Sequence, residues 1–281
     1  MNYYPTERRV CIKCGKTFFG PIRGGASDEY CLRPCKPKTA CYMQDRDEQI
    51  ERNKCNGKLK HSVQQFTPHL VKTNYVKNFT WVGVPIIQYP TDMFTIAELL
   101  WRIKPDLVLE TGMAFGGSLL FYASVLEAIG DGEVIGIEID PRDDNMQRLK
   151  SYDLFKNRIS IIKASSTEWG HVKPWLYQYT SGCRTIFVIL DSHHTHEHVL
   201  KELELYAPLV SKDSYLVVMD TAIQFYGHLD KNQDRPWGVD NNPWTAVQEF
   251  MRGNDEFIID KEVEQQALIT SAPDGWLRRA R

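Results

Sequence analysis

The chain has 281 residues, of which 42% are hydrophobic and 25% are charged, so it is long and apolar enough to form a globular core. Lys and Arg total 34 against 36 for Asp and Glu, and the net charge of -2 excludes a global attraction to nucleic acid or to an anionic membrane. Because no apolar run approaches the roughly 18 residues of a membrane span and the N-terminus lacks a signal-peptide pattern, we expect a cytoplasmic protein without a membrane segment.

Six of the seven cysteines lie in residues 1–60: Cys11, Cys14, Cys31, Cys35, Cys41 and Cys55. The first four form a C-x2-C pair and, sixteen residues later, a C-x3-C pair, which is close to the spacing of a four-cysteine zinc site. Zinc would supply the folding energy that this segment, poor in apolar residues, lacks. The last two cysteines are alternative ligands, so the fourth ligand stays open. We expect a zinc-ribbon-like module at 1–60 and a linker at 61–80.

From residue 91 onward, helix-like and strand-like runs alternate. Residues 91–104 have helix spacing, with Phe94, Ala97, Leu100 and Trp101 on one side. The strand-like runs are 106–111, 133–140, 158–165, 185–191, 214–220, 257–260 and 267–272. The helix-like runs are 116–129, 143–152, 169–179, 196–210 and 245–253. This order predicts an α/β fold, a doubly wound and mostly parallel sheet with helices on both faces.

A glycine-rich loop directly follows the first strand of this sheet. It runs from Glu110 to Ser118, and it contains Gly112, Gly116 and Gly117. Glycines permit a tight turn and the close approach of a ligand, and the start of the following helix presents free N–H groups to a carboxylate or phosphate. We expect a nucleotide-like ligand here, although an ordinary strand-to-helix loop has the same composition. The spacing is not the G-x-G-x-x-G of NAD-binding proteins.

The next strand ends in two acidic residues, Glu138 and Asp140, on the same face. An acidic side chain at this position can accept hydrogen bonds from both hydroxyls of a ribose. The two residues compete for this role. We favour Glu138, and we interpret Asp140, which precedes Pro141, as a solvated carboxylate at the strand end.

Two later strands each end in an aspartate, Asp191 and Asp220. Because the carboxyl ends of parallel strands meet at one edge of the sheet, both carboxylates should lie there. A hard divalent cation such as Mg²⁺ or Mn²⁺ would offset their repulsion, and Thr221 offers a further oxygen. Helix capping or solvation is the alternative explanation for either aspartate. Asp191, which lies next to the glycine-rich loop, is also a candidate for contacting the cofactor and for catalysis.

Four histidines follow the first of these aspartates: His193, His194, His196 and His198. A histidine can take the proton of a metal-bound hydroxyl, because imidazole titrates near neutrality. His194, three residues after Asp191, is our candidate general base. We interpret His198 as structural, and we leave His193 and His196 open, including a second metal site.

Several separated strings resemble one known family in the same order. They span residues 81–92, 104–123, 134–140, 190–211, 214–221 and 272–279. These strings resemble the cephalosporin hydroxylase/rhamnosyl O-methyltransferase family over about Trp81 to Arg279. That family is similar to catechol O-methyltransferase in its nucleotide-binding core. The resemblance implies a Rossmann-like methyltransferase domain at 81–281, a sheet with one reversed terminal strand, and S-adenosylmethionine at the glycine-rich loop.

Carried over one position at a time, the resemblance implies that Gly112 and Ser118 contact the amino-acid part of S-adenosylmethionine and that Glu138 contacts the ribose. It places the metal at Asp191 and Asp220. The position of His194 matches that of a general base in related sugar O-methyltransferases.

One position departs from the family pattern. Many relatives have an acidic residue before the second aspartate, where this chain has Met219, which puts the metal site in question. Sites like that of catechol O-methyltransferase have an apolar residue there and an amide after the aspartate, where this chain has Thr221.

The sequence therefore predicts methyl transfer from S-adenosylmethionine to a hydroxyl of a sugar or glycosylated metabolite. The resemblance also suggests that the protein is a homo-oligomer. The alternatives are a zinc-containing scaffold whose methyltransferase-like domain is inactive and, less favoured, a nucleic-acid methyltransferase. The acceptor is not disclosed, but the long loop from Ala222 to Asn242, which contains Trp237, is suited to a polyol.

Overall fold

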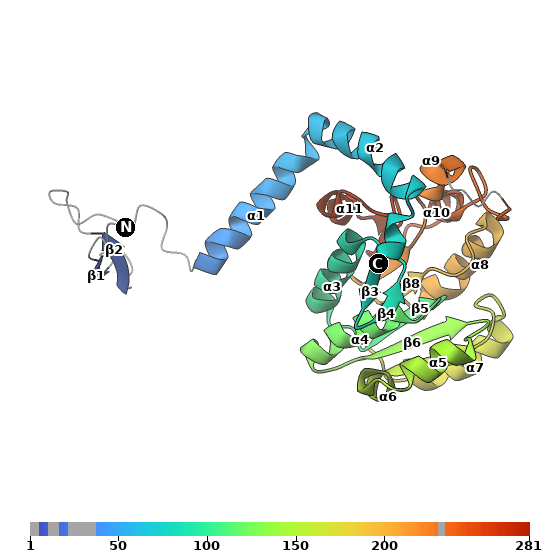
Figure 1. Cartoon of the computed structure of the whole chain (residues 1–281). Coiled ribbons are helices and arrows are strands. Elements are labelled where there is room, and N and C mark those ends of the chain that lie inside the picture. Colours follow the sequence, from blue (N-terminus) through green and yellow to red (C-terminus); the bar gives the residue numbers. More distant parts are fainter. Residues whose placement is uncertain (1–5, 11–16, 22–37, 230–233) are drawn as a thin grey trace. The chain divides into compact units, whose positions relative to one another are not determined.

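The computed structural model describes residues 6–10, 17–21, 38–229 and 234–281 (Figure 1). The chain divides into two compact units, Met1–Asn56 and Gly57–Arg281. In the first unit, strands β1 (Thr6–Val10) and β2 (Thr17–Pro21) pair antiparallel, and helix α1 spans Lys38–Lys54. The four cysteines predicted to bind zinc, Cys11, Cys14, Cys31 and Cys35, lie outside the described residues, so the zinc module stays a prediction.

The second unit begins with a helix where the sequence led us to expect a linker. Helix α2 covers Gly57–Lys72, and a 3-10 helix, η1, covers Tyr75–Asn78. The more buried side of α2 carries Leu59, Val63, Thr67 and Leu70, spaced at four, four and three residues. This spacing is helical, but its apolar stripe is thin, and the polar residues around it hid the pattern. A two-stranded hairpin, β3 (Phe79–Trp81) and β4 (Val84–Ile86), follows.

The main sheet has seven strands in the order β10-β11-β9-β8-β5-β6-β7. Its strands are β5 (Leu107–Thr111), β6 (Glu133–Glu138), β7 (Ile159–Lys163), β8 (Ile186–Leu190), β9 (Tyr215–Val218), β10 (Phe257–Ile259) and β11 (Trp276–Arg279). Strands β5 to β9 pair parallel to one another, whereas β11 runs antiparallel to both β9 and β10. The predicted mostly parallel α/β sheet is confirmed, and its reversed strand is the last one in the sequence.

The strand predicted at 267–272 is wrong. After β10, the Asp260 side chain accepts hydrogen bonds from the backbone N–H groups of Glu262 and Val263, and it thereby caps the short helix α11 (Lys261–Ala267). The chain then turns, and β11, the strand that pairs with β9, begins at Trp276, nine residues after the predicted start at residue 267. In the segment 267–272, Ala267 ends α11, Leu268 is exposed, and Ala272 is buried in the loop before β11.

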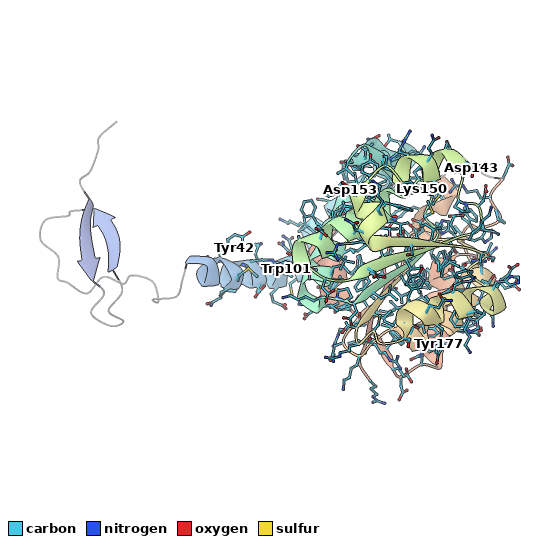
Figure 2. The ribbon with its side chains drawn as sticks, turned by 90° about the horizontal axis from the view of Figure 1, so that it is seen from below. Tyr42, Trp101, Asp143, Lys150, Asp153 and Tyr177 are labelled. Atoms are coloured by element: carbon cyan, nitrogen blue, oxygen red, sulfur yellow. The ribbon has the colours of Figure 1, made fainter. Side chains whose placement is uncertain are left out.

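Helices cover both faces of the sheet. They are α3 (Pro90–Ile103), α4 (Gly117–Ile129), α5 (Asp143–Leu149), α6 (Asp153–Arg158), α7 (Trp169–Thr180), α8 (His196–Tyr206), α9 (Ile223–Tyr226) and α10 (Pro243–Arg252), with 3-10 turns η2 (Ala207–Leu209) and η3 (Gly227–Leu229). One apolar core contains side chains of α3, α4 and α6, and a second one contains side chains of α7, α8 and α10. Figure 2 shows Asp153 of α6 and Tyr177 of α7 on opposite sides of the sheet.

Helix α3 forms where the spacing predicted it, but its buried side differs from the predicted one. Met93 and Ile96 are buried, whereas Phe94 and Trp101 are 76% and 56% exposed. The helix carries apolar residues around most of its circumference, so periodicity alone admits more than one inner face. Within the described residues, no helix combines the length and the apolar character that crossing a membrane requires.

Candidate functional site

A cavity of about 570 Å³ opens at the carboxyl ends of the parallel strands, a volume typical of small-molecule sites. Seven residues singled out in the sequence line it: Gly112, Glu138, Asp191, His193, His194, His198 and Asp220. They follow four different strands, β5, β6, β8 and β9, and the fold brings them together because these strands are parallel and adjacent. The cavity is therefore the candidate active site.

The loop after β5 is glycine-rich because its backbone is crowded. Gly112 has φ +80°, and a Cβ there would lie 2.3 Å from the carbonyl oxygen of Asp191. A side chain on Gly116 (φ +86°) would collide with α5, and one on Gly117 would meet the carbonyl oxygen of Pro85 at 2.3 Å. Of the three glycines, only Gly112 lines the main cavity, and Gly117 lines a smaller one beside it. The glycines let the loop and the ends of β5 and β8 approach closely.

Glu110 and Ser118 contact each other beneath this loop. Glu110 is 1% exposed, and its carboxyl group accepts hydrogen bonds from the hydroxyls of Ser118 (2.7 Å) and Tyr122 (3.0 Å). Burial raises the pKa of Glu110 to about 8, although both hydroxyls oppose this shift. Ser118 lines the smaller cavity and Glu110 lines neither, so this pair supports the loop from below.

Glu138 faces the cavity, and its competitor Asp140 does not. The Glu138 carboxylate accepts hydrogen bonds from the backbone N–H groups of Met113 and Asp140, each at 3.0 Å. Each oxygen keeps a lone pair for a further donor, because a carboxylate oxygen can accept two hydrogen bonds. Glu138 thus connects β6 to the glycine-rich loop and can still receive ligand hydroxyls.

Asp191, His194 and Asp220 form a compact group at the cavity wall. One potential ligand atom from each lies within 4.8 Å of the other two, and Nε2 of His194 is 3.3 Å from Oδ2 of Asp220. The two carboxylates of this group fit a hard divalent cation, because such ions prefer oxygen ligands, and the imidazole of His194 lies beside them. Within the part of the chain that the structure describes, no other three acidic, histidine or cysteine side chains meet in this way.

Burial shifts the pKa of two members of the group, Asp191 and His194. Burial, and then the nearby Asp220 carboxylate, holds the pKa of Asp191 well above its usual range. Burial lowers the pKa of His194, which therefore stays neutral at pH 7. A neutral imidazole can accept a proton, so His194 has the protonation state that a general base needs.

The two residues beside Asp220 in the sequence, Met219 and Thr221, are both buried. Asp220 has a left-handed backbone (φ +57°), a conformation that aspartate tolerates better than most residues, and its side chain lines the cavity. Met219 is 1% exposed and packs in the core instead. Thr221 is fully buried, and its hydroxyl donates to the carbonyl oxygen of Pro273 at 2.6 Å. Thr221 does not line the cavity, and its role as a metal ligand stays a prediction.

The other histidines have separate partners. Nδ1 of His193 is 3.0 Å from the Thr195 hydroxyl, and His196 contacts Thr245 and Glu249. His193 and His196 therefore do not share ligands for a second metal site.

His198 lies on α8 at the edge of the cavity, as part of a polar cluster. Its Nε2 is 3.0 Å from the Ser166 hydroxyl, 3.1 Å from that of Ser192 and 3.6 Å from the carboxylate of Glu202. These contacts fit the structural role expected for His198.

The sequence analysis did not single out Gln88, and it named Trp237 without assigning it a contact. Nε2 of Gln88 donates to Oδ2 of Asp191 at 2.7 Å. The Trp237 ring lies 4.9 Å from the His194 ring and 5.2 Å from the His193 ring, centroid to centroid, both edge to face. The only sequence signals were the place of Gln88 in the string 81–92 and that of Trp237 in the long loop after Asp220.

Comparisons with known proteins give a consistent result. The family model described as rhamnosyl O-methyltransferase/CmcI matches residues 73–280. A rhamnosyl O-methyltransferase of Mycobacterium leprae (strain TN) is 32% identical over 212 residues, which cover 73% of this chain and 86% of the relative. A protein of the same name from Mycobacterium tuberculosis (strain ATCC 25618 / H37Rv) is 29% identical over 204 residues, which cover 71% and 78%. The solved structure "CmcI-N160 apo-structure" shares the fold, with a TM-score of 0.52 at 16% identity over 73% of this chain and 77% of that one.

Proposed function

This chain belongs to the rhamnosyl O-methyltransferase/CmcI family and is an S-adenosylmethionine-dependent O-methyltransferase, and from this premise we propose that it methylates a hydroxyl group of a sugar or of a glycosylated metabolite. The names of its mycobacterial relatives support a sugar acceptor. The observation that carries the proposal is the meeting of Asp191, His194 and Asp220 at the wall of the cavity that Glu138 also lines.

We place the cofactor along the carboxyl ends of β5 and β6. The free lone pairs of Glu138 would accept hydrogen bonds from the ribose hydroxyls. The loop after Gly112 would hold the amino-acid part, where the backbone and the first turn of α4 offer N–H groups to its carboxylate. The contact between Glu138 and the N–H of Met113 keeps these two halves of the cofactor site in a fixed relation.

We place a divalent cation, Mg²⁺ or Mn²⁺, at Asp191 and Asp220. Their oxygens are the ligands that these ions prefer, and the two carboxylates lie close enough to share one ion. When bound, the cation would lower the pKa of the acceptor hydroxyl and orient it. The acidic neighbours of Asp191 favour a cation here, because the carboxylates of Asp220, Glu110 and Glu202 all raise the pKa of Asp191.

The chain's own residues would then handle one proton. Nε2 of neutral His194 takes the proton of the acceptor hydroxyl while the oxygen attacks the methyl carbon. The carbon–sulfur bond breaks, its electron pair stays on sulfur, and S-adenosylhomocysteine and the methyl ether leave. Asp220, 3.3 Å from Nε2 of His194, stabilises the imidazolium that forms. The step needs in-line alignment and no covalent enzyme intermediate.

Calorimetric titration with S-adenosylmethionine, with and without Mg²⁺, tests the cofactor site. The wild type should bind, and Glu138→Gln should weaken binding by about 10-fold or more, because a carboxylate accepts stronger hydrogen bonds than an amide. Asp140→Asn is the matched control, since Asp140 is exposed and lies outside the cavity lining. Equal binding by the wild type and Glu138→Gln would contradict this assignment.

A further inference from the structure

Gln88 reaches the active site from a distant part of the chain. It follows β4, is 6% exposed, and donates through Nε2 to Oδ2 of Asp191 at 2.7 Å across 103 positions of sequence. Within the described residues, no other hydrogen bond reaches the Asp191 carboxylate. Gln88 therefore holds Oδ2 of Asp191, and Oδ1 accepts no hydrogen bond from the described residues.

The type of donor suits the charge of the site. A buried carboxylate needs a hydrogen-bond donor, because an unpaired buried charge is strongly disfavoured. A lysine or arginine at this position would meet the need but would also cancel the negative charge that attracts a cation. An amide orients the carboxylate and leaves the charge of Asp191 and Asp220 in place.

The backbone around Gln88 is anchored on both sides. Before it, the carbonyl of Pro85 packs so closely against α4 that a side chain on Gly117 would not fit. After it, the Thr91 hydroxyl donates to the carbonyl of Ile269, and Oδ2 of Asp92 accepts from the backbone N–H of Ser271 at 2.8 Å. Gln88 thus extends from a fixed backbone and can set the orientation of Asp191.

We infer that Gln88 is a positioning residue, which fixes the Asp191 carboxylate in the orientation that binds the divalent cation. The inference rests on the proposed function, because it takes Asp191 as a metal ligand. Gln88 itself contacts neither the cation nor the reacting atoms. Gln88 also lines the smaller cavity beside Gly112 and Ser118, whereas Glu138 does not, so loss of the Gln88 amide should leave the ribose contact of Glu138 unchanged.

The test is a titration of the full chain with Mn²⁺, in which electron paramagnetic resonance reports the free ion. Gln88→Met keeps the length of the side chain and removes the donor, and Gln88→Leu serves as a second variant. Gln266→Met is the matched control, because Nε2 of Gln266 also donates to a carboxylate, that of Glu98, but on the surface. The same proteins are titrated with S-adenosylhomocysteine, and kcat and KM are measured for S-adenosylmethionine.

We expect both Gln88 variants to bind Mn²⁺ about 10- to 100-fold more weakly, the range typical for residues that orient a metal ligand. Their affinity for S-adenosylhomocysteine should fall much less than their affinity for Mn²⁺, because the ribose contact of Glu138 is kept, and kcat should fall more than KM changes. Unchanged Mn²⁺ affinity in a folded Gln88 variant overturns the inference and leaves the proposed function standing. A wild type that binds no Mn²⁺ overturns the proposed metal site, and the inference with it. Failure of both variants to fold makes Gln88 a structural residue and also overturns the inference.

Discussion

Replacing Asp191 with asparagine should have opposite effects on stability and on turnover. The side chains of Asp191 and Asp220 approach within 4.8 Å, and at an effective dielectric constant of about 20, two unit charges at that distance repel by about 3.5 kcal/mol. The amide introduced by Asp191→Asn would remove this repulsion and could still accept the hydrogen bond from Gln88. The hydrogen bond from Gln88 already offsets part of the cost, so we expect a gain of about 1–3 kcal/mol in the free energy of unfolding without metal, at a pH where Asp191 is ionised.

The pH dependence of stability also predicts that Asp191→Asn is more stable than the wild type. The pKa of Asp191 is higher in the folded than in the unfolded protein, where it is near 3.8. The Asp191 carboxyl therefore contributes fully to the free energy of unfolding below the unfolded pKa, and this contribution is lost as the pH rises through the folded pKa. The wild type should therefore lose stability over that range relative to Asp191→Asn. Since about 1 kcal/mol shifts the melting temperature of a domain of this size by roughly 2–4 °C, calorimetry in the presence of a chelator can measure the gain.

Turnover should fall in the same variant, because an amide is a weaker ligand for a hard cation. Binding of S-adenosylmethionine should stay close to that of the wild type. Asp213→Asn, at an exposed position outside the cavity lining, serves as the control. A variant that melts below the wild type without metal, or that keeps wild-type turnover, would refute the reasoning.

Two further predictions concern the general base and the N-terminal cysteines. His194→Asn should lower kcat by about 10²- to 10⁴-fold at unchanged cofactor affinity. Because burial lowers the pKa of His194, the kcat of the wild type should fall with decreasing pH through a pKa below 6.5. A kcat that stays constant from pH 5 to 8 would count against the role of His194 as general base. Elemental analysis of the full chain should find about one zinc per chain. Joint replacement of Cys11 and Cys14 by serine should abolish zinc binding. Retention of zinc in that variant would disprove the proposed ligands.

The sequence predicted the sheet well because its strands are buried on both faces and form continuous apolar runs. It did less well where local signals were weak or ambiguous. Helix α2 has too thin an apolar stripe to stand out, and α3 has apolar residues around most of its circumference. Before the segment 267–272, the Asp260 side chain caps helix α11, which extends to Ala267, and no apolar periodicity indicates such a cap.

At the site, the strand-end residues were predictable and their contacts were not. Parallel strands bring their carboxyl ends together, which is why Glu138, Asp191 and Asp220 could be expected at one cavity. The role of Gln88 depends on a contact across 103 residues, which no local pattern encodes. For the same reason, the sequence could not show that Thr221 turns toward Pro273.

The most direct test of the central claim is methyl transfer itself. The full chain is incubated with Mg²⁺, S-adenosylmethionine carrying an isotope-labelled methyl group and a panel of rhamnosides and other glycosides, and the products are analysed by mass spectrometry and nuclear magnetic resonance. We predict a labelled methyl ether on a sugar oxygen, lost on addition of a chelator and in Asp191→Asn. Binding of S-adenosylmethionine without transfer to any sugar hydroxyl, or transfer that a chelator leaves unchanged, would contradict the account.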